Sequence, residues 1–112
     1  VELPDDTGDT GYLDALDAAL PTVFARAAPQ LVIYLAGADP FAGDRLGRLK
    51  LSKAGLAARD ELVLSECRRR GLPVAIAMAG GYARDIGDTV DIHAATITTA
   101  ARLFRQATTA SL

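Results

Sequence analysis

Two side chains that could do chemistry follow two short apolar stretches of the sequence. Asp39 comes after the stretch 31–35 and precedes a glycine-bearing loop at 43–47. Tyr82 comes after the stretch 73–78 and directly follows Gly80 and Gly81 in the sequence. A carboxylate is a hard oxygen ligand for a metal ion. A phenol can donate a hydrogen bond to an oxygen that becomes negative in a transition state. Asp39 and Tyr82 are therefore the first candidates for a functional site.

Each candidate also has a plain structural interpretation. An aspartate after a strand commonly caps a loop, and a tyrosine after two glycines can simply pack on one. Gly80 and Gly81 let the backbone pass close to a ligand, as in phosphate-binding loops, but the G-x-G-x-x-G spacing is absent. On the residues alone, a metal site, a phosphate site and an ordinary loop all stay open.

The elements that position these residues are predicted to form a parallel α/β unit. The stretches 31–35 and 73–78 are continuous rather than alternating, which predicts strands buried on both faces. A helix is expected between them, capped by Ser52 and closed by Gly71. Strands separated by a helix predict a parallel sheet with a right-handed crossover. Ligands gather at the carboxyl ends of such strands, where Asp39 and Tyr82 follow.

Two further helices are predicted outside this unit. Apolar residues recur at three- and four-residue steps from 13 to 27, with Asp9 or Thr10 as the cap. Pro21 is expected to kink or restart this helix. A last helix follows Asp88. The inward faces are predicted to be Leu13, Leu16, Leu20, Val23, Phe24 and Ala27 in the first helix, Leu56, Val63, Leu64 and Cys67 in the middle one, and Val90, Ala94, Ile97, Ala101 and Phe104 in the last.

The size and charge of the chain narrow its class. Its 112 residues allow one domain at most, and two strands are too few for an independent sheet of this kind. They would leave unpaired edges and uncovered apolar faces, so a piece of a larger domain is expected. With 12 basic and 14 acidic residues, the chain lacks the basic surface of a nucleic-acid-binding protein. No stretch is long enough for a membrane span.

The remaining reactive side chains are predicted to be structural. Cys67, the only cysteine, excludes an internal disulfide, suits a reducing cytoplasmic setting and is expected in the core. His93, the only histidine, is expected to be a core or surface residue, and Asp44 and Arg45 to be structural residues of the loop rim. The acidic residues near the last helix's start are interpreted as helix-terminal charges: Asp85, Asp88 and Asp91.

Several segments together resemble one family. They are Ala-Gly-Ala-Asp at 36–39, Gly-Asp-Arg-Leu-Gly at 43–47, Met-Ala-Gly-Gly-Tyr at 78–82 and Gly-Asp-Thr-Gly-Tyr-Leu at 8–13. The chain resembles the zinc-dependent histone deacetylases over nearly its whole length. The run at 51–63 is most similar to the class IV and bacterial branch. One departure is Ala79, where many class I relatives carry a further glycine.

The resemblance implies a fold, an activity and a set of site residues. The fold would be a βαβ piece of the three-layer α/β/α sheet of the arginase and deacetylase type. Asp39 would be a ligand of Zn²⁺, and Tyr82 would polarise the scissile amide carbonyl. Leu46, Gly80 and Gly81 would line the substrate channel. The substrate would be acetyl-lysine or a small acylated amine.

The family's His-His pair and Asp-x-His motif are absent from the chain. We therefore expect residues 1–112 to be the C-terminal part of a single deacetylase domain, inactive without the N-terminal part of the same domain. Two alternatives belong to other classes. One is a stand-alone βα module that binds a nucleotide or phosphate through Gly80 and Gly81. The other is an interaction domain that keeps the fold and has lost catalysis.

Overall fold

The computed structural model describes residues 1–110, which form a mixed α/β unit. In chain order its elements are α1 (Asp9–Ala27), β1 (Val32–Leu35), α2 (Lys53–Arg69), β2 (Val74–Ala77) and α3 (Ile86–Ala110). This order is the one that the hydrophobic pattern predicts. Within the described range, no helix combines the length and the apolar character needed to cross a membrane.

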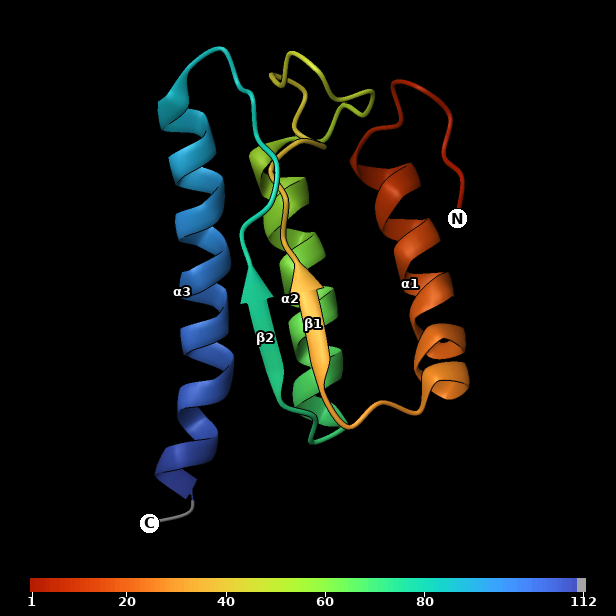
Figure 1. The fold of residues 1–112 in the computed structure, drawn as a ribbon, viewed down its shortest axis with the longest axis vertical. Coiled ribbons are helices and arrows are strands. Elements are labelled where there is room, and N and C mark those ends of the chain that lie inside the picture. The colour runs from red at the N-terminus through yellow and green to blue at the C-terminus, as the bar shows by residue number, and fades with distance from the viewer. Residues whose placement is uncertain (111–112) are drawn as a thin grey trace.

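β1 and β2 form a parallel pair connected through α2. Val32 lies opposite Val74, and Leu35 lies opposite Ala77. Because the strands are parallel, the loops that follow them leave the same edge of the sheet. Figure 1 shows both loops running upward from the two arrowheads. The predicted parallel βαβ arrangement is confirmed.

α2 is the centre of the unit, since it packs against both α1 and α3. Ser52 caps it as predicted, because the Ser52 Oγ accepts a hydrogen bond of 2.9 Å from the Gly55 N–H. At the other end, the positive φ of Gly71 lets the Leu72 N–H donate to the Cys67 carbonyl at 2.9 Å. The predicted inward face is buried: Leu56, Val63, Leu64 and Cys67.

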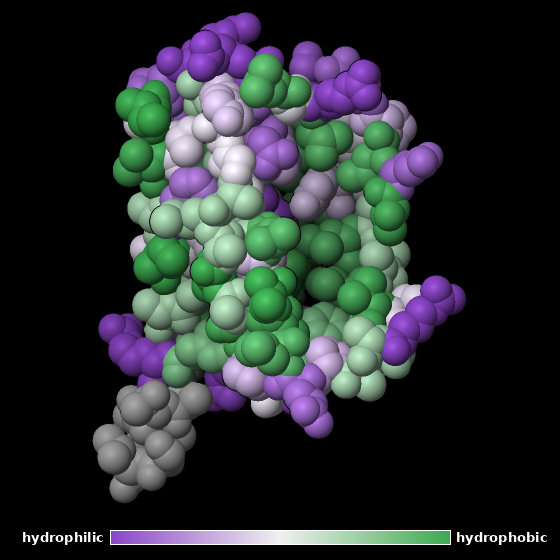
Figure 2. All heavy atoms as spheres, in the orientation of Figure 1, coloured by the Kyte–Doolittle hydropathy of each residue, from purple (hydrophilic) through white to green (hydrophobic). Residues whose placement is uncertain are grey.

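Helices cover only one face of the sheet, so the prediction of strands buried on both faces is wrong. Val32 and Tyr34 are half-buried, whereas Ile33 and Leu35 expose 67% and 66% of their surface. Tyr34 points toward α2, because its hydroxyl donates to Asp60 of that helix, and its neighbours along the strand point away. Figure 2 shows hydrophobic side chains gathered over the strands on this open face. The expected uncovered apolar face is confirmed.

α1 departs from the sequence prediction at its start and in its middle. Of the two effects expected of Pro21, a kink or a restart, the restart is wrong, because α1 continues through Pro21 from Asp9 to Ala27. Neither Asp9 nor Thr10 caps it. The N-cap is Gly8, and the Asp9 carboxylate instead accepts hydrogen bonds from the Ser52 N–H at 2.8 Å and hydroxyl at 2.5 Å. Of the apolar face predicted for this helix, only Phe24 is buried.

α3 buries a different face from the one that its apolar periodicity predicts. Ile92 and Thr96 are buried, whereas Val90 and Ile97 are more than half exposed. The Thr96 hydroxyl donates to the carboxylate of Asp60 on α2 at 2.5 Å. The face of α3 that packs on the core thus combines the apolar contact of Ile92 with the polar contact of Thr96, and the more apolar stripe is left uncovered.

Candidate active site

Asp39 lies in the loop after β1, with its carboxylate between two glycines. A β-carbon placed on Gly37 would lie 2.5 Å from the Asp39 Oδ1, and one placed on Gly80 would lie 2.7 Å from the same atom. A β-carbon on Gly37 would in addition lie 2.8 Å from the Ala79 carbonyl oxygen, and this backbone contact requires glycine there. Gly80 also has a φ of +54°, which disfavours other residues. The loop after β2 is thus packed directly against the Asp39 side chain.

Among the described residues, the Asp39 carboxylate has no hydrogen-bond or ion-pair partner. Its residue is exposed, and it accepts no hydrogen bond from the described part of the chain. Within the same residues, no group of three or more histidine, cysteine, aspartate or glutamate side chains could hold a metal ion. Asp39 therefore offers one free oxygen ligand, and a complete metal site needs further ligands from elsewhere.

Asp44 ties the two loops together. Its Oδ1 accepts a hydrogen bond from the Tyr82 N–H at 2.6 Å, and its Oδ2 accepts from the Leu46 and Gly47 N–H groups at 2.9 and 2.6 Å. Burial acts to raise the pKa of Asp44, but these three N–H groups outweigh it and hold the pKa below its ordinary value. Leu46 and Tyr82 consequently lie at the same rim, and the prediction that Asp44 is structural is confirmed.

The backbone of Tyr82 is fixed, while its side chain reaches out of the loop. Its carbonyl accepts hydrogen bonds from the Arg45 N–H at 3.0 Å and from the Arg45 Nε at 3.3 Å. Gly81, at a φ of +140°, fits between neighbouring elements, since a β-carbon there would lie 3.2 Å from the Ala38 Cβ and 3.0 Å from the Thr89 Cγ2. The Tyr82 side chain is 55% exposed. Its hydroxyl has no hydrogen-bond partner among the described residues.

Replacing Asp44 with Ala should release this clamp. Hydrogen bonds to a charged group contribute about 1.5–3 kcal/mol each, so the amide hydrogens of Tyr82 and Gly47 should exchange on the order of tenfold faster or more. Because the folded-state pKa of Asp44 is depressed, its stabilising effect is present above the unfolded pKa of about 3.9 and is lost as pH falls through the lower folded value. Hydrogen exchange followed by mass spectrometry measures the change.

The control for this experiment is Asp85→Ala, because the Asp85 carboxylate binds a single N–H, that of Gly87, at 2.9 Å. This variant should leave exchange at Tyr82 unchanged. Unaltered exchange at Tyr82 in Asp44→Ala would show that the clamp does not hold the loop.

Comparison with known proteins identifies the family. The family model for the histone deacetylase domain matches residues 1–98, which is most of the chain. The chain belongs to the histone deacetylase family. The resemblance inferred from the two loops is thereby confirmed.

Two curated proteins are similar in sequence to this histone deacetylase segment. An uncharacterized protein of Picosynechococcus is 45% identical over 91 residues, covering 81% of this chain and 30% of that protein. Histone deacetylase 2 of Arabidopsis thaliana is 40% identical over 95 residues, covering 81% of this chain and 24% of that protein. The chain thus spans between about a quarter and a third of the length of the relatives it matches.

A solved structure shows the same fold. The crystal structure of acetylpolyamine aminohydrolase from Burkholderia pseudomallei superposes with a TM-score of 0.76 at 20% sequence identity. The match covers 92% of this chain and 28% of that one. The predicted arginase and deacetylase type of α/β fold is therefore confirmed for this histone deacetylase segment.

The other reactive side chains stay outside the Asp39 and Tyr82 loops. Cys67 is completely buried in α2, and burial raises the pKa of its thiol, so it is a core residue as predicted. His93 lies on α3 with its Nδ1 buried and unpartnered among the described residues. It forms no ligand cluster with other side chains there.

Two of the three acidic residues near the start of α3 are helix-terminal charges as predicted, because Asp85 precedes the helix and Asp88 is in its first turn, whereas Asp91 lies in the second turn. Asp85 directly precedes the helix, and its Oδ1 accepts a hydrogen bond from the Gly87 N–H at 2.9 Å. The helix therefore begins at Ile86, earlier than the start predicted after Asp88. The Lys53 Nζ binds the carboxylates of Asp88 and Asp91 at 2.6 and 2.8 Å.

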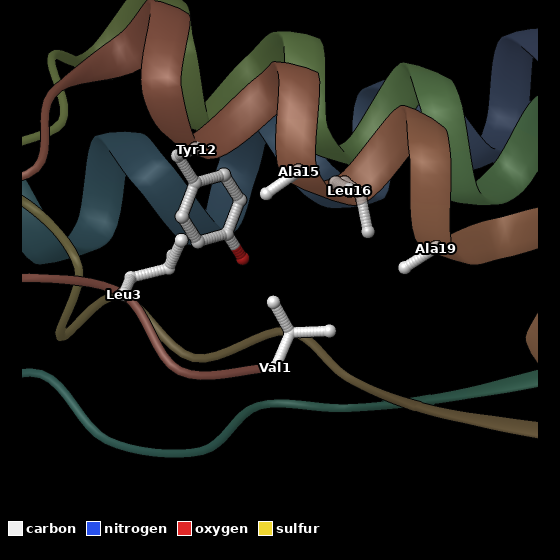
Figure 3. Close-up of a pocket in the computed structure, with 6 residues that line it drawn as sticks. All are labelled: Val1, Leu3, Tyr12, Ala15, Leu16 and Ala19. Atoms are coloured by element: carbon white, nitrogen blue, oxygen red, sulfur yellow. The ribbon is translucent and has the colours of Figure 1, made fainter.

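A further pocket lies along α1 and is separate from the candidate site. Val1 and Leu3 of the N-terminal segment face Tyr12, Ala15, Leu16 and Ala19 of α1 (Figure 3). These side chains are apolar apart from the Tyr12 hydroxyl, and the pocket includes no residue of the Asp39 and Tyr82 loops. It offers no second set of groups for catalysis.

Proposed function

We propose that this chain supplies one side of the active site of a zinc-dependent deacetylase. The enzyme would hydrolyse the amide of an acetylated amine such as acetyl-lysine. The observation that carries this proposal is the placement of Asp39 and Tyr82 on two adjoining loops joined by Asp44. Both side chains present a polar group without a partner among the described residues. Family membership supplies the chemistry that such a pair would perform.

Asp39 fits the role of one zinc ligand. Its carboxylate is exposed and has no partner among the described residues, and it occupies a space that a β-carbon on Gly37 or Gly80 would fill. Zinc, when bound, polarises a carbonyl and lowers the pKa of a coordinated water. The other ligands and the general base would come from the N-terminal part of the domain.

Tyr82 would donate its phenolic hydrogen to the amide oxygen as that oxygen becomes negative. Its fixed backbone and exposed side chain suit a donor that must be aimed at a reacting atom. Leu46 is 71% exposed and shares the Asp44 clamp with Tyr82. We assign Leu46, Gly80 and Gly81 to the wall of the substrate channel, because they lie on the two loops that Asp44 joins.

We also propose that residues 1–112 are the C-terminal part of one deacetylase domain. The curated relatives and the aminohydrolase structure are each about three to four times as long as the part matched here. The exposed face of β1, with Ile33 and Leu35, and the exposed stripe of α3, with Val90 and Ile97, would pack against the rest of a three-layer sheet. The N-terminal part of the domain is thus the first partner of this chain.

The substrate would be a lysine side chain or a small amine carrying an acyl group. The Arabidopsis relative is named a histone deacetylase, and the Burkholderia neighbour is named for acetylated polyamines. We place the enzyme in the cytoplasm and in the bacterial branch of the family. The single buried Cys67 suits a reducing compartment, and the Picosynechococcus relative shares 45% identity.

The phosphate-binding alternative is disfavoured by charge. Gly80 lies against the Asp39 carboxylate, since a β-carbon on Gly80 would be 2.7 Å from Oδ1. A phosphate approaching this turn would meet a negative charge at short range. The space beside the Gly81 α-carbon is also filled, by the side chains of Ala38 and Thr89.

The experiment that tests the proposal compares the complete protein carrying this chain with residues 1–112 alone. The complete protein should bind zinc and release acetate from an acetyl-lysine peptide or an acetylpolyamine, and a chelator should abolish this activity until zinc is restored. The isolated chain should show neither, because it supplies one zinc ligand and no general base. Zinc-dependent turnover by the isolated chain would contradict the division of the site. A complete protein without zinc or activity would favour the interaction-domain alternative.

A further inference from the structure

A buried polar cluster lies beneath the Asp39 loop, between β1, α2 and α3. Arg59 and Asp60 of α2 are 4% and 0% exposed, and the Arg59 Nε and Nη2 donate to the Asp60 Oδ1 at 3.1 and 3.0 Å. The hydroxyls of Tyr34 and Thr96 donate to Asp60 at 2.5 Å each. Burial, as the largest cause, raises the pKa of Tyr34, so its hydroxyl stays a donor. The buried carboxylate is therefore fully partnered, as a buried charge requires.

One nitrogen of Arg59 does not bind Asp60 and instead forms a hydrogen bond to a residue of the candidate site. The Arg59 Nη1 donates a hydrogen bond of 2.6 Å to the carbonyl of Gly37, which is itself buried. Gly37 is one of the two glycines that enclose the Asp39 carboxylate. The bond therefore fixes the peptide against which the Asp39 side chain rests.

We propose that Arg59 is a positioning residue for the metal site, which orients the Asp39 carboxylate through the Gly37 carbonyl. This inference rests on the proposed function, because it concerns the zinc ligand assigned there. Arginine suits the task because its planar fork serves two acceptors in fixed directions, Asp60 on one side and Gly37 on the other. A lysine ammonium is a point charge on a flexible stem and does not reproduce that geometry.

The test measures zinc affinity in the complete protein by competition with a chromophoric chelator. The test variant is Arg59→Met with Asp60→Asn, which removes both buried charges together and leaves the Gly37 carbonyl without its donor. The control is Tyr34→Phe with Thr96→Val, which weakens the cluster but keeps the Arg59 bond to Gly37. Thermal unfolding of the zinc-free proteins reports the structural cost of each change.

The test variant should bind zinc about 10- to 100-fold more weakly than the wild type, as is usual for a lost outer-shell contact. The control should unfold at a lower temperature than the wild type but bind zinc with wild-type affinity. Should the test variant fail to fold, Arg59→Lys, which keeps the charge, should show the same loss of affinity. The inference would be overturned if the folded test variant, or Arg59→Lys used in its place, bound zinc with wild-type affinity. It would also be overturned if the control lost as much zinc affinity as the test variant. A wild-type protein that binds no zinc overturns the proposed function first and this inference with it.

Discussion

Replacing Tyr82 with Phe in the complete protein should lower kcat by about 10²–10³-fold, the usual effect of removing one oxyanion donor. KM should change little, because the hydroxyl contributes mainly when the carbonyl oxygen becomes negative. The fold should be unaffected, since the Tyr82 hydroxyl has no partner among the described residues and the backbone clamp by Asp44 remains. Steady-state kinetics on an acetylated peptide, with zinc content measured in the same samples, gives the result.

The matched control for this variant is Tyr12→Phe, which removes the same hydroxyl from α1. Tyr12 lines the pocket formed with the N-terminal segment (Figure 3) and packs against the core cluster that includes Ala38, but it has no part in the Asp44 clamp that holds Tyr82. Its variant should keep wild-type kcat. Full activity in Tyr82→Phe would remove Tyr82 from the catalytic site, and an equal loss in both variants would indicate a general effect of losing a tyrosine hydroxyl.

The element order and the place of the site could be predicted because they depend on local signals. Continuous apolar stretches marked both strands, and Ser52 and Gly71 marked the ends of α2 through side-chain and backbone chemistry that acts within a few residues. A helix between two strands then required a parallel pair. The loops of Asp39 and Tyr82 consequently had to leave the same edge of the sheet.

Burial could not be predicted equally well, because it depends on what lies beside each element. The runs of β1 and α3 have the composition of buried segments, yet Ile33, Leu35 and Ile97 are more than half exposed. Composition reports the apolar surface that a segment has, not whether a neighbour covers it. Thr96 lies on the inward face of α3, where its hydroxyl donates to Asp60, and hydrophobic periodicity does not register that contact.

The polar contacts that build the site were the least predictable part. The Asp44 carboxylate meets the Tyr82 N–H, and the Arg59 guanidinium meets the Gly37 carbonyl, each across a long sequence separation. Arg59 and Asp60 received no role from the sequence, since adjacent charged residues on a helix are ordinarily solvent-exposed. The pattern that could have indicated their burial is their position on the same inward face of α2 as Leu56, Val63 and Leu64.

Replacing Asp39 with Ala in the complete protein should remove zinc binding and with it nearly all turnover. The loss of zinc affinity should exceed the about 10- to 100-fold that outer-shell changes cost, because a ligand itself is removed. The zinc-free protein should unfold at the wild-type temperature, since the Asp39 carboxylate has no hydrogen bond within the described residues to lose. The increase in unfolding temperature on adding zinc should disappear, because that increase measures binding to the folded state.

Two further variants separate a ligand from a merely acidic loop residue. Asp39→Glu keeps the charge, but its extra methylene moves the carboxylate away from the position that Asp39 Oδ1 occupies beside Gly37 and Gly80. It should therefore also bind zinc poorly. Asp5→Asn removes a carboxylate from an exposed ion pair with Arg48 and should bind zinc normally. Wild-type zinc affinity in Asp39→Ala would show that Asp39 is not a zinc ligand.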